Sequence, residues 1–325
     1  MIVKDDDVFV VDSKQEGIFR FDKYGRFENS LRHKGQGDKE YQIMYGVGVH
    51  AGKVYFLDMT ARIQVYDYND NYLKTILLDS IPNRSQLYAG EDGRLYVGRG
   101  FQYSTQLLVY DTIGNRLGSY FPGPEDVRGF AIPQGNFHSL GNYGKGVYFT
   151  GFFDPTIYLL EGDSTSVLAK FDFGKHSLTD AFFAGTSEDI SKRYWDPKVR
   201  DVYNGPTLIF QMDNVVIGRD WITFYAHNSG RIMIYCNRKS GESLTNRSFK
   251  EPYKTLLGDF NGFDGYLPET DEYYFNVSAY ALKETIEKLA AENPDYAETY
   301  PFLKDIDTEL ITEDTNDFVV FAKFK

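Results

Sequence analysis

The sequence predicts an all-β protein, a six-bladed β-propeller of four-stranded antiparallel blades with a short helical insertion in the last blade. The first observation is a unit that recurs three times between residues 7 and 121, with an aspartate at the same place in each copy: Asp22, Asp67 and Asp111. Successive copies are 45 and 44 residues apart, and short alternating apolar runs at this period are typical of propeller blades. The second observation is the aromatic content of 17%, which suits the pleated faces of sheets.

The 325 residues hold about seven such periods, so, allowing for insertions, we predict six blades in one domain spanning residues 1–325. The first three units are regular, and the later ones keep the spacing while the pattern weakens. The predicted blades are approximately 1–37, 43–79, 85–121, 136–174, 207–250 and 258–325. Two stretches interrupt the repeat and are predicted to be insertions, 175–206 and 279–316.

In each regular unit the aspartate starts the turn between the third and the fourth strand. Its side chain can bond to the main chain two residues further on, and a glycine such as Gly25 or Gly114 tolerates a left-handed backbone. In the second copy we expect an asparagine in the left-handed position. The three aspartates are therefore predicted to be turn residues and not a carboxylate cluster.

Helices are expected within the two insertions. Ser187 is a suitable N-cap for a short helix in the first insertion. Ser278 is a suitable N-cap for a helix that ends near Asn293. After the second insertion, residues 317–325 are again expected to form a strand, which closes the ring of blades. The apolar stripe of the second helix is predicted to be Tyr280, Leu282, Ile286 and Leu289.

Charge and composition exclude several classes of protein. The net charge of −12 and the pI near 5.0 argue against a nucleic-acid partner. The single cysteine, Cys236, excludes an internal disulfide and a Cys-based zinc site, and we expect a buried, inert thiol. No apolar run is long enough for a transmembrane helix, and the first residues carry no export signal. We expect the protein to be a monomer.

Several segments, taken in order, resemble one bacterial family. They are VFVVD…IFRFD with the KGQG-x-x-EY loop, then IYLLEGD…KFDFGK, and the closing DFVVFAKF. Together they resemble the bacterial six-bladed β-propeller family related to NHL-repeat proteins. The resemblance implies an exported protein, often a lipoprotein, in the periplasm or on the outer surface, which binds or scaffolds more than it catalyses.

The chain departs from this family in two respects. Asp38 and Lys39 stand where the family usually has Pro-Gly, which argues against a rigid turn there. Members of the family also begin with an export signal and an extra strand before the point that corresponds to Met1. We therefore expect that residues upstream of Met1, a signal and a blade strand, are missing from this sequence.

Strand alternation predicts where a site would lie. In a four-stranded blade the tight turns fall on one face of the disc, and the second-to-third and blade-to-blade connections fall on the other. The long segments all belong to this second face, called here the long-loop face, and functional residues concentrate on such loops. The segments are 33–44, 122–137, 175–206, 251–262 and 279–316.

Six residues are candidates for ligand binding on the long-loop face. Arg84 and Arg128 would bind a carboxylate or phosphate, or else pair with a local acidic side chain. Trp195 and Tyr103 would stack on a sugar or a peptide, or else pack the loops onto the disc. The full set is Tyr45, Arg84, Tyr103, Arg128, His138 and Trp195.

No cofactor is predicted, and Ca²⁺ or another divalent metal is the alternative. The run from Asp259 to Gly265 fails the EF-hand template, and the histidines lack the spacing of metal ligands. The histidines are His33, His50, His138, His176 and His227. None of the common nucleophile, zinc-protease or phosphate-loop motifs is present.

Three functions are left open. The first is a non-enzymatic propeller of the bacterial cell envelope that binds a small ligand, a glycan or a protein on the long-loop face. The alternative is a metal-dependent hydrolase of the lactonase or lyase kind with its site in the central channel, as in some six-bladed relatives. The third is a structural partner in a larger surface assembly.

Overall fold

The computed structural model describes residues 1–12, 17–80, 85–99, 105–122, 139–151, 154–177, 208–209, 211–227, 231–245, 262–312, 315 and 317–324. The chain forms two compact units. The first comprises Met1–Val215 and Tyr225–Arg231, and the second comprises Val216–Phe224 and Ile232–Lys325. The prediction of a single domain stays a prediction.

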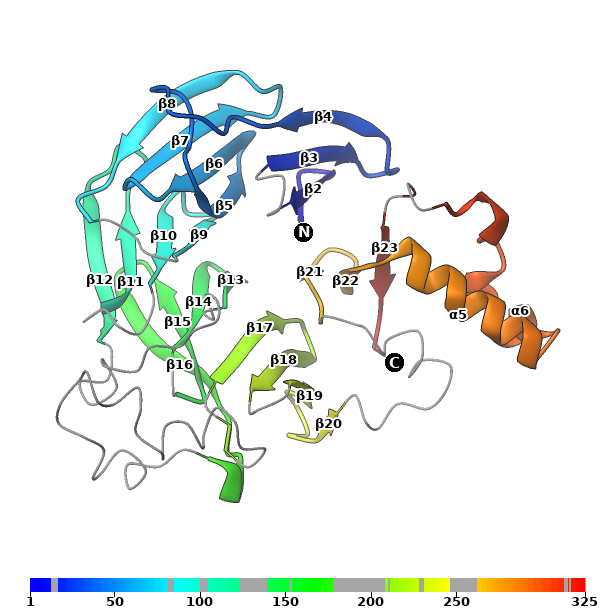
Figure 1. Cartoon of the computed structure of the whole chain (residues 1–325). Coiled ribbons are helices and arrows are strands. Elements are labelled where there is room, and N and C mark those ends of the chain that lie inside the picture. The colour runs from blue at the N-terminus through cyan, green and yellow to red at the C-terminus, as the bar shows by residue number, and fades with distance from the viewer. Residues whose placement is uncertain are drawn as a thin grey trace, which may run out of the picture. The chain divides into compact units, whose positions relative to one another are not determined.

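The first unit contains four antiparallel sheets of four strands, each strand pairing with the next in sequence. The blue, cyan and green sheets of Figure 1 are these four. The first two sheets are β1 (Ile2–Lys4), β2 (Asp7–Asp12), β3 (Gly17–Asp22) and β4 (Phe27–Leu31), then β5 (Met44–His50), β6 (Lys53–Asp58), β7 (Arg62–Asp67) and β8 (Tyr72–Leu77). The next two are β9 (Gln86–Ala89), β10 (Leu95–Gly98), β11 (Thr105–Tyr110) and β12 (Arg116–Pro122), then β13 (Leu140–Tyr143), β14 (Gly146–Thr150), β15 (Thr156–Glu161) and β16 (Ser164–Lys170). The short 3₁₀ helix η2 (Gly174–His176) follows.

These sheets pack face to face because their inner strands, such as β6, β10 and β14, bury apolar side chains on both faces. One buried cluster joins the first two sheets through Phe9 and Phe56, and another joins the third and fourth through Leu107 and Phe149. Glycine lets the innermost strands approach closely. A Cβ atom on Gly46 of β5 would lie 2.6 Å from the main-chain nitrogen of Leu87 in β9.

The aspartates of the repeat form the predicted turns. Oδ1 of Asp67 accepts hydrogen bonds from the main-chain nitrogens of Asn69 and Asn71, at 2.9 and 2.8 Å. Asp22 and Asp111 make the same pair of bonds. The expectation of an asparagine in the left-handed position was wrong, because Asp70 holds it, with φ of +69°. Like asparagine, aspartate has a short polar side chain that tolerates this region.

The loop between the first and second sheets corrects a second expectation. The main-chain nitrogen of Glu40 donates to the carbonyl oxygen of Gly37 at 3.0 Å, so a tight turn forms without Pro-Gly. The Glu40 carboxylate folds back and accepts a hydrogen bond from Gly37 N at 2.7 Å. Tyr41 is fully buried and stacks on Phe56, with ring centroids 4.9 Å apart. The charged residues that replace Pro-Gly stay on the exposed side of this turn.

Two further sheets follow. The fifth consists of β17 (Gln211–Ile217), β18 (Trp221–His227), β19 (Arg231–Asn237) and β20 (Ser243–Thr245). In the sixth, three strands lie among the described residues: β21 (Gly265–Leu267), β22 (Glu272–Val277) and β23 (Phe318–Ala322). Six successive antiparallel sheets confirm the predicted fold class, the β-propeller.

The predicted helix interrupts the sixth sheet, between β22 and β23. It is α5 (Ala279–Glu292), drawn in orange in Figure 1, and Ser278 caps it by accepting a hydrogen bond from Ala281 N. Leu282 and Ile286 are buried as predicted, but Tyr280 is 55% exposed and does not belong to the apolar stripe. It precedes Leu282 by two residues, which places it on the opposite side of the helix.

Three short helices lie between α5 and β23: α6 (Tyr296–Thr299), η4 (Pro301–Leu303) and η5 (Thr308–Leu310). Leu303 of η4 packs with the buried face of α5. The short helix expected at Ser187 lies outside the described residues. Among the helices that the structure describes, none has the length and apolar character needed to cross a bilayer.

Cys236 is half-buried, and its desolvation raises the pKa of the thiol, which favours the inert form.

Candidate functional site

Most of the ligand-binding residues proposed from the sequence lie outside the described part of the chain. These are Arg84, Tyr103, Arg128, His138 and Trp195. Tyr45, in β5, is described and half-buried, and it packs against the apolar cluster that the second and third sheets share. Because five of the six candidates lie outside the described residues, their role in binding stays a prediction.

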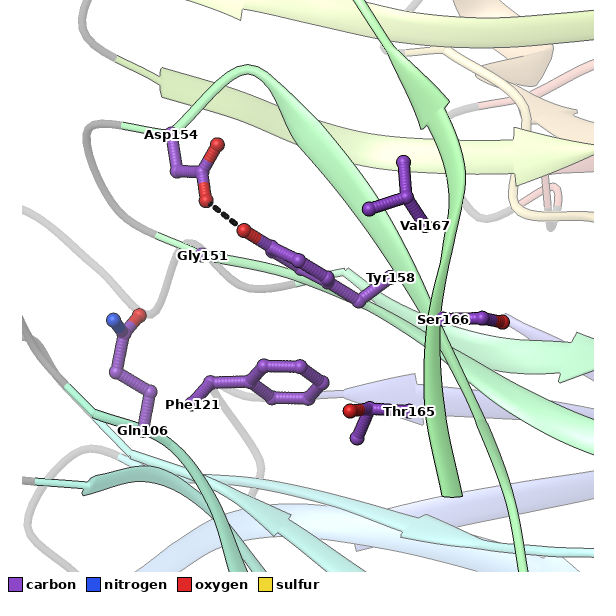
Figure 2. A pocket seen from close by; sticks show the side chains of 8 residues that line it. All are labelled: Gln106, Phe121, Gly151, Asp154, Tyr158, Thr165, Ser166 and Val167. Atoms are coloured by element: carbon purple, nitrogen blue, oxygen red, sulfur yellow. Dashed lines mark hydrogen bonds between the residues drawn. The ribbon is translucent and has the colours of Figure 1, made fainter.

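A different set of residues forms a pocket of about 430 Å³ between the third and fourth sheets (Figure 2). They include two aromatic rings, a carboxylate, an amide and three residues that carry a hydroxyl group. The lining consists of Gln106, Phe121, Gly151, Asp154, Tyr158, Thr165, Ser166 and Val167.

Four of the eight lining residues lie at strand ends that belong to the long-loop face, while Thr165 and Ser166 follow the tight turn between β15 and β16. Gln106 is near the start of β11, which follows the second-to-third connection of its blade. Phe121 is near the end of β12, where the chain leaves for the next blade. Gly151 and Asp154 lie between β14 and β15. All four residues are thus beside the connections on which functional residues were expected.

Three aromatic rings pack together at one side of the pocket: Phe121 and Phe149 stack, and the ring of Tyr158 is tilted by 33° to that of Phe121. The ring of Phe121 is almost parallel to that of Phe149, with centroids 4.9 Å apart and an angle of 5°. Its centroid is 4.7 Å from that of Tyr158. Phe121 has φ of +57°, a left-handed conformation that costs a bulky residue roughly 1–3 kcal/mol. The packing on both neighbours offsets this strain and keeps the ring in the lining.

The carboxylate of Asp154 is held by the second ring of the pocket. The Tyr158 hydroxyl donates to Oδ2 of Asp154 at 2.5 Å, as the dashed line in Figure 2 shows. Desolvation of the ring, together with the hydrogen bond to Asp154 and its negative charge, raises the pKa of Tyr158 to about 12. The phenol therefore stays neutral and keeps donating at physiological pH.

A glycine keeps the space between the two main polar groups open. A Cβ atom on Gly151 would lie 3.3 Å from Oε1 of Gln106 and 3.8 Å from the Cβ of Asp154. Gln106 itself is buried, so its amide is fixed by its surroundings. The amide of Gln106 and the side chain of Asp154 thus lie on two sides of Gly151.

This arrangement is suited to binding. The described lining has aromatic faces, hydrogen-bonding groups and one charged side chain, Asp154. Among the described residues, no three His, Cys, Asp or Glu side chains gather as metal ligands do. The metal-dependent hydrolase stays an untested alternative.

The sequence did not indicate the residues that line this pocket, and the prediction of a site on the long-loop face stays a prediction. The lining comes from two blades, and which side chains meet depends on how those blades pack. One local signal was available: Asp154 and Tyr158 are four residues apart at the start of a strand. Nothing in the sequence around Phe121 and Gln106 indicates that they join this pair.

Comparison with known proteins identifies the family. The model of a family described as a domain of unknown function, DUF4934, matches residues 1–323. The chain belongs to this family. No curated protein matches the DUF4934 chain. A crystal structure of a protein inferred to be exported, from Bacteroides fragilis NCTC 9343, is 15% identical with a TM-score of 0.72. The similarity covers 99% of the DUF4934 chain and 88% of the other, and at this identity it shows the fold alone. The relationship to NHL-repeat proteins stays a prediction.

Proposed function

We propose that this DUF4934 chain is a non-enzymatic binding protein of the bacterial cell envelope, which holds a small ligand in the pocket between the third and fourth sheets. The observation that carries the proposal is the packing of the Phe121 and Tyr158 rings beside the carboxylate of Asp154 and the amide of Gln106. Small-molecule sites combine apolar walls with a few well-placed polar groups in this way.

The size and rigidity of the pocket support this function. Its volume of about 430 Å³ lies within the range of small-molecule sites, roughly 300–1,000 Å³. Tyr158 is fixed by its bond to Asp154, and Phe121 by its neighbours in the stack. A site already held in shape loses little conformational entropy when a ligand binds.

The location in the envelope rests on two similarities. The structural relative from Bacteroides fragilis is inferred to be exported. The sequence segments that resemble the six-bladed bacterial family point to the same compartment. Cell fractionation of the native host, with the protein detected by antibody, tests this part: a cytoplasmic location contradicts it.

The binding function is tested by a ligand screen with paired variants. Thermal shift and NMR titration would be carried out with monosaccharides, amines, amino acids and short peptides. We expect a hit whose affinity falls about 10-fold in Phe121→Ala, because an aromatic contact contributes about 0.5–1.5 kcal/mol beyond its buried area. Tyr280→Ala, which removes an exposed ring from α5, is the control and should bind as the wild type does.

A second pair of variants separates binding from folding. Tyr158→Phe keeps the ring and removes the hydroxyl that holds Asp154, and Tyr280→Phe makes the same change on the surface. We expect weaker binding only in the first. If no compound binds, or if the pocket variant of each pair binds as tightly as its control variant, the pocket is not the site and the proposal fails.

A further inference from the structure

We infer that the ligand of this pocket presents a primary ammonium group next to an apolar face, as an amino sugar or an alkyl amine does. The inference rests on the proposed function and adds the chemical class of the ligand. It is carried by the charge of the lining, by the acceptors that border the gap at Gly151, and by the aromatic wall.

The charge of the lining has no counterpart among the described residues. Asp154 is the one acidic or basic side chain of the described lining, and no described residue forms a salt bridge with it. The hydroxyl of Tyr158, which donates a hydrogen bond to Asp154, is neutral because its pKa is raised. A neutral hydrogen bond orients a carboxylate but leaves its charge in place. A cation supplied by the ligand is the natural complement.

The gap at Gly151 provides a place for such a cation. Oε1 of Gln106 and the side chain of Asp154 border it from two sides. An ammonium group has three N–H donors and no acceptor, so it matches a set of oxygen acceptors. A neutral hydroxyl would also fit, but it would leave the charge of Asp154 without compensation.

The aromatic wall favours the same class of ligand. Phe121 and Tyr158 present apolar surface beside the carboxylate (Figure 2). Carbon atoms next to an ammonium group are apolar and pack on such rings, and the cation is attracted to the π faces. Val167, the cross-strand partner of Tyr158, adds aliphatic surface and is exposed.

Anionic ligands are disfavoured by the same features. The described lining carries no basic side chain, and the whole chain has a net charge of −12. A phosphate or carboxylate would approach a negative protein and meet Asp154. A cation is instead attracted at long range, and salt weakens this attraction.

The test compares ligands of one shape and different charge by isothermal titration calorimetry or NMR. Glucosamine, N-acetylglucosamine and glucose form one series, and 1,5-diaminopentane with 1,5-pentanediol forms the other. We expect at least one amine to bind about 10-fold more tightly than its neutral counterpart, and the preference to shrink with added salt. The series that binds more tightly distinguishes a sugar from an alkyl amine as the source of the ammonium group.

Two variants assign the preference to one side chain. Asp154→Asn keeps the acceptor for Tyr158 and removes the charge, so it should abolish the preference for the amine. Asp305→Asn makes the same change at an exposed position and should leave the preference intact. A thermal melt of each variant checks that it is folded.

The outcomes separate this inference from the function on which it rests. If neutral and charged ligands bind equally well and Phe121→Ala weakens both, the pocket is a binding site and the ammonium inference is wrong. If the amine preference survives in Asp154→Asn, the inference is also wrong. If neither series binds while a ligand of another class does, and Phe121→Ala weakens that ligand, the binding function stands without the inferred class. If nothing binds, both fail.

Discussion

The ammonium group of Lys74 donates to the main-chain carbonyl oxygen of Thr112 at 2.5 Å, and this bond joins the second sheet to the third. Thr112 directly follows Asp111, the aspartate that starts the turn between the last two strands of its blade. The turn therefore presents a carbonyl oxygen to the neighbouring blade.

The same acceptor position is used at two other junctions in the first unit. Arg20 donates to the carbonyl oxygen of Tyr68, which follows Asp67, at 3.2 Å. Arg94 donates to that of Gly162, which follows Glu161, at 2.9 Å. The donors come from different positions in their blades. What repeats is the acceptor, the residue that directly follows the acidic residue at the start of the turn.

The first prediction concerns this junction. Lys74→Met keeps the apolar stem and removes the donor, and we expect it to lower the free energy of unfolding by about 1.5–3 kcal/mol, the usual range for a hydrogen bond to a charged group. Lys288→Met, at an exposed position on α5, should change it by less than about 0.5 kcal/mol. Urea denaturation measures both. Equal midpoints in the two variants would show that the bond contributes nothing.

The second prediction concerns the turn carboxylates and pH. Hydrogen bonds from the side chain and main chain of Asn71 hold the pKa of Asp67 below its ordinary value of 3.8. A carboxyl whose pKa is lowered by folding stabilises the protein above about pH 4 and loses that contribution as the pH falls. We therefore expect Asp67→Asn to have a stability that depends less on pH between 6 and 3.

The corresponding turn of the fifth sheet begins with an asparagine, so the opposite substitution, asparagine to aspartate, can be made there. Oδ1 of Asn237 also accepts two main-chain hydrogen bonds, from the nitrogens of Lys239 and Ser240, whereas Asp67 accepts from the second and fourth residues after it. Asn237→Asp should therefore fold normally and increase the dependence of stability on pH in the acid range. Thermal melts at half-unit pH steps measure both variants. The same acid slope in wild type, Asp67→Asn and Asn237→Asp would contradict the argument.

The sequence predicts the sheets well because a blade is a local structure: strand, turn and strand follow one another within about 45 residues. The pocket is different, because Phe121 and Tyr158 meet only when two blades pack. The three local errors have local causes. Asp70 takes the left-handed position expected for an asparagine, because aspartate tolerates that region too. A turn forms at Asp38 without proline because Gly37 and Glu40 supply its hydrogen bond. Tyr280 is exposed because it lies two residues before Leu282, on the other side of the helix.

The last prediction concerns the strained residue of the pocket. At most positions glycine is less favourable than alanine by roughly 0.5–1 kcal/mol, because glycine loses more chain entropy on folding. At position 121 the backbone has φ of +57°, a region that glycine enters without steric cost. Phe121→Ala and Phe121→Gly remove the same ring contacts with Phe149 and Tyr158. We therefore expect the order to reverse, with Phe121→Gly at least as stable as Phe121→Ala in urea denaturation. If the alanine variant is clearly the more stable, the left-handed backbone at Phe121 is not a source of strain, and the aromatic stack has no strain to offset.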